Sequence, residues 1–490
     1  MPGIVFIDAP TSPRERIGKL SKIIDLSRDR PHIGILTLAA VARERGWRTQ
    51  VIDPYPFQWS DEEIRRQVLE FRPDVIGISS HTLGIVNGNR LAGVLKDVLP
   101  QVPILVGGPH VTSLPDQTLM EFPNYDIGVM GEAEEILLDL LELLPQQPSE
   151  EQLKGVEGIS FRGKSGIVVN PRRQYRLDLD SIPMPAWDLL PQFPFLYSPS
   201  LGSGAGTRPT GSLFTTRGCP WRCKFCDRGV FGDNLRKFSA RKVMDQILHL
   251  YHEYDIRELM FGDDTLLVDK QRMMELSEML IDAKLDLRWE CMARVIDADL
   301  ELYHAIKKAG CFEVSYGIES ADDRISKLIF KPINQKTINR AIQITKEAGI
   351  RARGYFIFGL PGETEETLAV TSKFILTSGL DDVAIFSCTP YPGSALYQIA
   401  SSYGTFEKAW NRMNNVETVF VPYGLTAERI ESLRLKVMRK FYFNPRFVWA
   451  WSRRLVRENG WKELLGRGGL YARFFKNTLA EFVSGLGRAA

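Results

Sequence analysis

Short apolar runs alternate with amphipathic helical patterns along most of this 490-residue chain, in two separate series. Strands separated by helices pair in parallel, because each helix carries the chain back along the sheet. In the first series, strands are predicted at residues 4–8, 49–53, 75–79, 104–106 and 127–130, and helices at 34–45, 61–71, 87–99, 116–122 and 133–144. Residues 1–145 are therefore predicted to form a doubly wound α/β domain, which binds ligands at the carboxyl ends of its strands.

The second series follows a predicted hairpin at 159–162 and 167–170 and a proline-rich segment at 182–199, interpreted as a linker or wrapping loop rather than a core element. Six strands are predicted at 213–216, 258–261, 288–293, 313–317, 354–358 and 383–387, with a helix after each of the first five. This pattern indicates a partial TIM-like (β/α)6 barrel. The predicted regions are then 1–145, the hairpin and linker at 146–211, the barrel at 212–395 and a helical extension at 396–490.

Three of the six cysteines, Cys219, Cys223 and Cys226, stand close together after the first strand of the second series. Three thiolates can bind three corners of a [4Fe-4S] cluster and leave the fourth iron open, whereas a structural metal site is closed by a fourth ligand. A zinc site completed by a distant residue is the alternative, disfavoured because the nearest downstream histidine is His249. The isolated cysteines are predicted to be buried core thiols: Cys291, Cys311 and Cys388.

The spacing C-x₃-C-x₂-C at this position resembles the radical S-adenosylmethionine (SAM) superfamily. In that family the amine and carboxylate of SAM chelate the open iron, and an electron from the cluster cleaves SAM to a 5′-deoxyadenosyl radical. The resemblance covers about residues 212–393. At the second strand end, Asp263 and Asp264 stand where the family has a Gly-Gly-Glu motif that receives the SAM amine, and which aspartate serves is left open.

Later strand ends extend this resemblance. It implies that Arg294 holds the SAM carboxylate, that Glu319 binds the ribose, and that adenine lies against backbone at Gly359. Each residue also has a structural alternative, because Asp263 and Glu363 could cap helices and Arg294 or Glu319 could sit in an ion pair. Their recurrence at successive strand ends of one barrel favours the binding roles.

The first domain resembles the Rossmann-like cobalamin-binding domain of the same superfamily, on segments 31–34, 106–110 and 130–134. Glycines there allow backbone to approach a corrin closely. The Asp-x-His-x-x-Gly motif that supplies a cobalt ligand in other cobalamin proteins is absent. Cobalt is then bound without a protein histidine, unless one of two loop histidines substitutes, or the domain is a docking module without cofactor. The predicted cofactor-binding residues of this domain are Ser79, His81, Gly107, Gly108, His110, Gly131 and Glu132.

The C-terminal region is basic and aromatic, with a local charge of +10 between residues 434 and 476 against a net charge of +2 for the chain. A helical cap on the barrel is the favoured interpretation. Contact with an anionic membrane surface comes second, and nucleic-acid binding is least favoured because no RNA-binding module follows the barrel. The absence of a signal sequence and of an apolar run of about 18 residues predicts a cytoplasmic protein, with a peripheral membrane location as the alternative.

Together the resemblances imply a radical SAM C-methyltransferase that acts on a small-molecule or lipid-like substrate. Its cofactors would be a [4Fe-4S] cluster, SAM and cobalamin as methyl carrier, with an electron donor such as flavodoxin or ferredoxin. One alternative is a cyclase or rearrangement enzyme acting on a tetrapyrrole or lipid-like substrate without net methylation. Another is a non-catalytic iron–sulfur or cobalamin sensor, which the strand-end carboxylates argue against. No side chain is assigned as catalytic.

Overall fold

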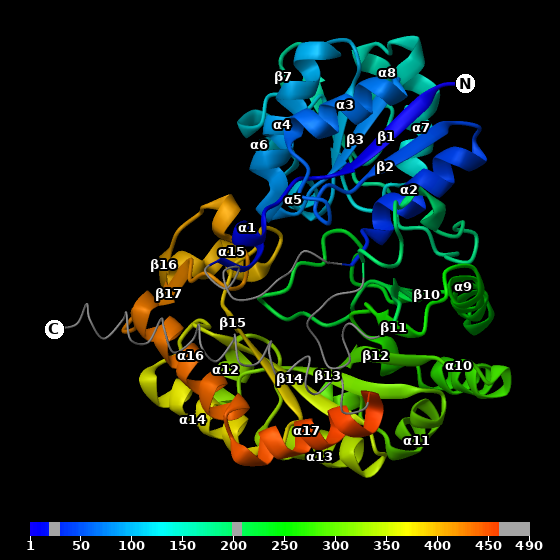
Figure 1. Ribbon diagram of the computed structural model, residues 1–490. Coiled ribbons are helices and arrows are strands. Elements are labelled where there is room, and N and C mark those ends of the chain that lie inside the picture. Colours follow the sequence, from blue (N-terminus) through cyan, green and yellow to red (C-terminus); the bar gives the residue numbers. More distant parts are fainter. Residues whose placement is uncertain (19–29, 198–207, 460–490) are drawn as a thin grey trace.

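The computed structural model describes residues 1–18, 30–197 and 208–459. Two sheets with parallel strands dominate it, one from each series of the sequence. Figure 1 shows the first sheet and its helices, coloured blue to cyan, above the second sheet and its helices, coloured green to yellow. Green loops that belong to the start of the second unit lie between the two.

The first sheet has the order β2-β1-β3-β4-β5-β6-β7. Strands β1 to β5 are parallel, β6 pairs antiparallel with β5, and β7 pairs antiparallel with β6. Its strands are β1 (Gly3–Asp8), β2 (Arg48–Ile52), β3 (Val75–Ser79), β4 (Ile104–Gly107), β5 (Ile127–Val129), β6 (Ile159–Gly163) and β7 (Gly166–Val169). The associated helices are α1 (Pro13–Ile17), α2 (Ile33–Glu44), α3 (Asp61–Phe71), α4 (Ile85–Val98), α5 (Pro109–Ser113), α6 (Pro115–Glu121), α7 (Glu134–Leu143) and α8 (Glu150–Lys154). Because β1 lies between β2 and β3, the switch point is at the carboxyl ends of β1 and β3.

The second sheet has the order β15-β14-β13-β12-β11-β8 and is parallel throughout. Its strands are β8 (Thr210–Leu213), β11 (Glu258–Phe261), β12 (Arg288–Ala293), β13 (Cys311–Glu319), β14 (Arg351–Phe358) and β15 (Asp382–Ser387). The helices of this unit are α9 (Ala240–Glu253), α10 (Lys270–Ala283), α11 (Leu300–Lys308), α12 (Asp323–Leu328), α13 (Gln335–Glu347), α14 (Glu365–Thr377) and α15 (Ala395–Ile399). The sheet does not join β8 to β15, so it is the predicted partial barrel.

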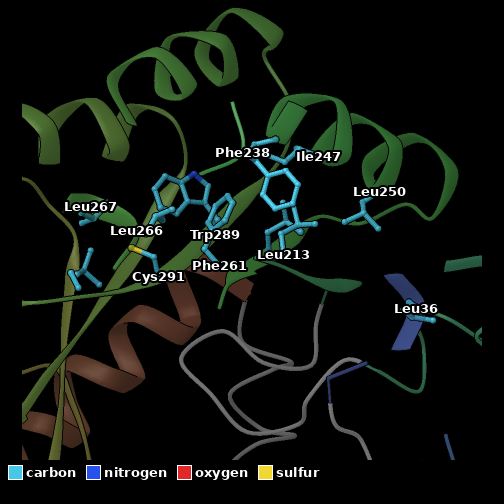
Figure 2. Close-up of a cluster of buried hydrophobic side chains, with 14 of the residues drawn as sticks. Leu36, Leu213, Phe238, Ile247, Leu250, Phe261, Leu266, Leu267, Trp289 and Cys291 are labelled. Atoms are coloured by element: carbon cyan, nitrogen blue, oxygen red, sulfur yellow. The ribbon is translucent and has the colours of Figure 1, made fainter. Parts of the chain in front are cut away.

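The core of the second unit lies between its strands and the outer helices. Trp289 of β12 meets Phe261 of β11 edge to face, with ring centroids 5.1 Å apart. Figure 2 shows these rings packed with Leu213 of β8 and with Phe238 and residues of α9. Cys291 lies in the same cluster, and Cys311 and Cys388 are also buried, which confirms that the isolated cysteines are core thiols.

Three parts of the fold differ from the sequence prediction. The strand expected at 213–216 is β8, three residues earlier, because the N–H of Thr215 bonds Asp263 instead of a neighbouring strand. The hairpin is confirmed, but β6 pairs with β5 and so extends the first sheet. The proline-rich segment supplies Trp187 and Tyr197, each 1% exposed, to the core. Its prolines break regular structure without excluding its aromatic rings from burial.

Two short ribbons were not predicted. They are β9 (Thr216–Arg217) with β10 (Arg236–Lys237), and β16 (Gly404–Phe406) with β17 (Phe420–Pro422). The predicted C-terminal helices are present as α16 (Ala427–Tyr442) and α17 (Pro445–Asn459), and α16 packs on β15 and α14 as a cap. Residues 460–476 of the basic aromatic region lie outside the described residues. No helix within the described ranges is long and apolar enough to cross a membrane.

Candidate active site

The three cysteines of the predicted cluster lie in one loop between β9 and β10, residues 218–235, here called the cysteine loop. Cys219 donates its backbone N–H to the carbonyl of Gly232 (3.2 Å). Gly218 has φ +86°, and a Cβ there would lie 2.2 Å from the carbonyl oxygen of Asn234. Only glycine therefore fits directly before the first thiol.

The thiols of Cys219, Cys223 and Cys226 are free; the first two are partly buried and the third is exposed. Across the described ranges, no three His, Cys, Asp or Glu side chains converge as the ligands of one metal ion do. In a [4Fe-4S] cluster each thiolate binds a different iron, so its ligands need not share one centre. The arrangement fits a cluster better than a zinc site.

Asp264 lies near the cysteine loop. The side chains of Cys226 and Asp264 are exposed, yet burial raises the pKa of Asp264, and burial together with Asp264 raises the pKa of Cys226 to about 12. His81, after β3 of the first unit, is also exposed, and burial lowers its pKa to about 4. The surrounding protein therefore disfavours the charged form of each of these three accessible groups.

Asp263 and Asp264 follow β11 but have different surroundings. Asp263 is buried, and its Oδ1 accepts from the N–H of Thr215 (2.8 Å) and from the hydroxyls of Thr215 (3.1 Å) and Thr216 (2.6 Å). These threonines lead into the cysteine loop, so Asp263 fixes the start of that loop. Asp264 is exposed and can accept hydrogen bonds from the ammonium group of a bound ligand.

Arg294, directly after β12, has hydrogen-bond donors available for an anion. Its guanidinium carbon lies 3.7 Å from the ring centroid of Trp221, a residue of the cysteine loop. The side chain is buried, and its Nε and NH1 have no hydrogen-bond partner among the residues that the structure describes. Buried guanidinium donors are costly without an acceptor, so this pair fits a carboxylate from a bound ligand.

Glu319 at the end of β13 is half of a buried ion pair. Its Oε1 accepts from Nζ of Lys331 (2.8 Å), and that ammonium lies 5.7 Å from the ring centroid of Phe225 in the cysteine loop. Glu319 has φ +64°, at a register shift between β13 and β14 that turns its side chain. A Cβ at Gly317 would lie 2.7 Å from both charged atoms, so glycine makes room for the pair. No sequence signal marks Lys331, which the sequence analysis missed.

The loop after β14 is held by Glu363. Its Oε2 accepts from the N–H of Gly359 (2.7 Å) and of Leu360 (3.0 Å). Burial raises the pKa of this carboxyl to about 8. Gly359 has φ +84°, and Thr364, rather than Glu363, caps α14. Glu363 therefore shapes the loop in which Gly359 was predicted to approach adenine.

The carboxyl edge of the first sheet presents open backbone. A Cβ at Gly107 would meet no atom within 4 Å, whereas Gly108 has φ +107° and a Cβ there would lie 2.5 Å from the carbonyl oxygen of Ser80. Ser79 shares a hydrogen bond with Nε2 of His32 (2.9 Å). The free space over Gly107 is a surface that a large planar cofactor can approach, which fits a corrin.

Two predicted cofactor residues of this unit lie elsewhere. His110 is 1% exposed, shares a hydrogen bond between its Nδ1 and Thr82 (3.2 Å), and packs edge-on against Trp410. It faces the core because α5 turns it away from the sheet edge, so of the two predicted loop histidines His81 is the exposed one. Glu132, next to Gly131 (φ +77°), is occupied by ion pairs to the second unit.

A carboxylate cluster lies at the switch point, where two of the predicted strands end. Asp53 after β2 is buried, and burial together with the nearby Asp8 raises its pKa. Asp8 ends β1 and pairs with Arg16 (3.8 Å), whose guanidinium carbon lies 3.6 Å from the ring centroid of Tyr55. These residues form a polar cluster at the carboxyl edge of the first sheet.

Comparisons with known proteins agree with this geometry. Family models for the radical SAM superfamily and the B12 binding domain match residues 213–375 and 23–141. The uncharacterized methyltransferase PH0819 of Pyrococcus horikoshii is 31% identical over 420 residues, which cover 85% of this chain and 89% of that protein. An anaerobic magnesium-protoporphyrin IX monomethyl ester cyclase of Rubrivivax gelatinosus is 27% identical over 423 residues, covering 85% and 75%. The solved cobalamin-dependent SAM radical enzyme OxsB, with aqua-cobalamin and SAM bound, shares the fold at a TM-score of 0.75 and 16% identity, over 97% of this chain and 72% of that one.

Three free thiols sit in one loop of a partial barrel, and that loop contacts a doubly wound domain, an arrangement that fits an iron–sulfur enzyme. The chain belongs to the radical SAM superfamily, in the class that carries a cobalamin-binding domain. Its cofactors are accordingly a [4Fe-4S] cluster, SAM and cobalamin. The non-catalytic sensor considered above is set aside, because the relatives that match both units are enzymes.

Proposed function

We propose that this protein transfers a methyl group from SAM to an unactivated carbon of a small-molecule substrate, with cobalamin as the methyl carrier. The observation that carries the proposal is the similarity to a methyltransferase along both units, at 31% identity over 85% of the chain. The geometry supports it, because Asp227 of the cysteine loop accepts a hydrogen bond from Ser113, which ends the helix that follows Gly107 and Gly108. The thiols and the proposed corrin edge therefore belong to segments in contact.

The binding of SAM is assigned to five groups. Cys219, Cys223 and Cys226 hold the cluster, Asp264 accepts from the amine, and Arg294 donates to the carboxylate. The support for Asp264 over Asp263 is that Asp264 is exposed, whereas Asp263 is 1% exposed and its Oδ1 accepts from the two threonines.

The nucleoside of SAM is assigned to the next two strand ends. Glu319, oriented by Lys331, has its Oε2 left for ribose hydroxyls. The backbone at Gly359, held by Glu363, lies beside adenine. Ser79, His81, Gly107 and Gly108 are proposed to line the corrin.

When bound, the cluster supplies the electron that cleaves SAM, and cobalamin supplies a transferable methyl group. The chain's own residues bind and orient SAM. A small electron carrier such as flavodoxin or ferredoxin is the proposed source of the electron.

A cyclase is the second candidate, because a magnesium-protoporphyrin IX monomethyl ester cyclase is 27% identical along the same 85% of the chain. Both candidates use the same SAM-binding groups. They differ in whether the methyl group of SAM is consumed, so the stoichiometry of SAM products distinguishes them.

The experiment incubates the anaerobically reconstituted protein with dithionite, cobalamin and SAM that carries a trideuterated methyl group. We expect S-adenosylhomocysteine to form only when cobalamin is present, and the label to be recovered in the corrin fraction or in an added substrate. Release of 5′-deoxyadenosine without any S-adenosylhomocysteine would reject methyl transfer in favour of the cyclase. Protein without added cobalamin is the control.

A further inference from the structure

Buried ion pairs join the first unit to the cysteine loop. Arg217, the last residue of β9, stands two positions before Cys219; its NH1 donates to Oε2 of Glu132 (2.9 Å) and its NH2 to Oε1 of Glu134 (2.5 Å). Arg236 lies opposite Arg217 on β10 and donates to the other oxygen of Glu132. The four charged side chains are only 5–11% exposed. We call this set of two arginines and two glutamates the clamp.

A second contact holds the far end of the cysteine loop. Asp227 directly follows Cys226, and its Oδ2 accepts from the hydroxyl of Ser113 (3.1 Å), the last residue of α5. Its Oδ1 accepts from the N–H of Gly229 (2.8 Å). A Cβ at Gly393 would lie 2.2 Å from Oδ1 of Asp227 and 2.4 Å from Oγ of Ser113, so only glycine lets the turn after β15 close over this contact. The loop is thus tied to the first unit on both sides of its thiols.

Both anchors sit on loops that are proposed to bind the corrin. Glu132 follows β5 through Gly131, whose φ is +77°. Ser113 ends the short helix that begins directly after Gly108, next to the open backbone at Gly107. A corrin that displaces either loop therefore also displaces the segments next to Cys219 or Cys226.

Buried charges are stable only with well-placed partners, so they constrain the geometry of the segments that carry them. Removing two arginines and two glutamates from water is costly, and their attraction offsets this cost only when the partners are well placed. Apolar side chains could join the two units with no such demand. The clamp therefore admits one arrangement of the cysteine loop against the first unit.

We propose that the clamp and the Ser113–Asp227 contact are a positioning device that fixes the iron cluster relative to the corrin and transmits corrin binding to the cluster. This inference deepens the proposed function and rests on it, since it takes both cofactors to be bound in one protein. Glu132 is then a positioning residue rather than a corrin ligand.

The test uses the full chain with its cluster reconstituted, and Glu132→Gln as the variant. The electron paramagnetic resonance spectrum of the dithionite-reduced cluster is recorded with and without hydroxocobalamin. We expect cobalamin to change the wild-type spectrum. Glu132→Gln should keep its iron and bind cobalamin by absorbance, but its spectral change should be at least about threefold smaller, because Gln cannot pair with both arginines.

Glu135→Gln is the matched control. Glu135 lies on α7, three residues after Glu132. It pairs with Arg173 (3.4 Å) and Arg176 (2.9 Å), neither of which belongs to the cysteine loop. It should show the wild-type spectral change even if it lowers stability. Ser113→Ala leaves the clamp intact and should lose part of the spectral change that cobalamin causes. It replaces Glu132→Gln as the test variant if Glu132→Gln does not fold.

The inference is overturned if Glu132→Gln or Ser113→Ala responds to cobalamin as the wild type does. It is also overturned if cobalamin binds to the wild type without altering the cluster spectrum. Failure of the proposed function is separate: a normal spectral response with no S-adenosylhomocysteine formed would reject methyl transfer and leave the positioning role standing.

Discussion

Replacing Cys219, Cys223 and Cys226 together with alanine is expected to remove the cluster and all SAM cleavage. Iron should fall from about four atoms per chain to background, because each thiolate supplies the only protein ligand of one iron atom. Formation of 5′-deoxyadenosine should fall by at least about a thousandfold, since nothing else in the proposed site can deliver an electron to SAM. Iron analysis and chromatography of the SAM products, both under anaerobic conditions, measure the two effects.

Cys291→Ala is the matched control for the triple variant. Cys291 is a free thiol of the same barrel, but it is buried in the core beside Trp289 and Phe261 (Figure 2). Its loss should lower stability by about 1 kcal/mol and leave the iron content unchanged. A triple variant that retains iron and cleaves SAM at the wild-type rate would contradict the assignment of the cysteine loop.

Replacing Arg294 with glutamine is expected to weaken SAM binding about ten- to hundredfold while the cluster remains. Charge-assisted hydrogen bonds to a carboxylate contribute about 1.5–3 kcal/mol, and the buried Nε and NH1 have no other acceptor in the described part of the chain. Arg294→Lys keeps the charge but loses the fork of donors, so an intermediate affinity is expected. Anaerobic calorimetry with SAM gives the dissociation constants.

The control for Arg294 lies at the other end of the same strand. Arg288 pairs with Glu258 (2.6 Å), away from the cysteine loop, so Arg288→Gln should leave the affinity for SAM within about twofold of the wild type. If Arg294→Gln binds SAM as tightly as the wild type does, Arg294 does not hold the SAM carboxylate.

The periodic elements were predictable because their signals are local. The helix predicted at 61–71 is α3, whose first residue follows a Ser60 cap that bonds the N–H of Glu63 (3.3 Å). The strand at 213–216 was misplaced because its apolar and β-branched residues fit a strand equally well in either register. The side chain that decided the register, Asp263, lies 48 residues away from Thr215.

Part of the site was predictable for a similar reason. The three thiols and the strand-end groups Asp264, Arg294 and Glu319 are visible in the sequence as residue types at set positions after strands. Their partners are not. Lys331 pairs with Glu319 only because a turn brings it back, and Arg217 meets Glu132 from 85 positions away.

The orientation of side chains was the least predictable feature. His110 follows a predicted strand end as His81 does, and both were candidate cobalt ligands. Trp410, which belongs to the far end of the chain, covers His110 in the core, with ring centroids 5.0 Å apart. Such a contact between distant segments leaves no local pattern in the sequence.

The most direct test of the account is electron–nuclear double resonance on the reduced wild-type cluster with SAM labelled by ¹⁵N in its amine and ¹⁷O in its carboxylate. The account predicts hyperfine coupling of both labels to the cluster, because the chain provides three thiolates and leaves one iron to SAM. Absence of both couplings, with a fourth side chain bound to that iron, would contradict it.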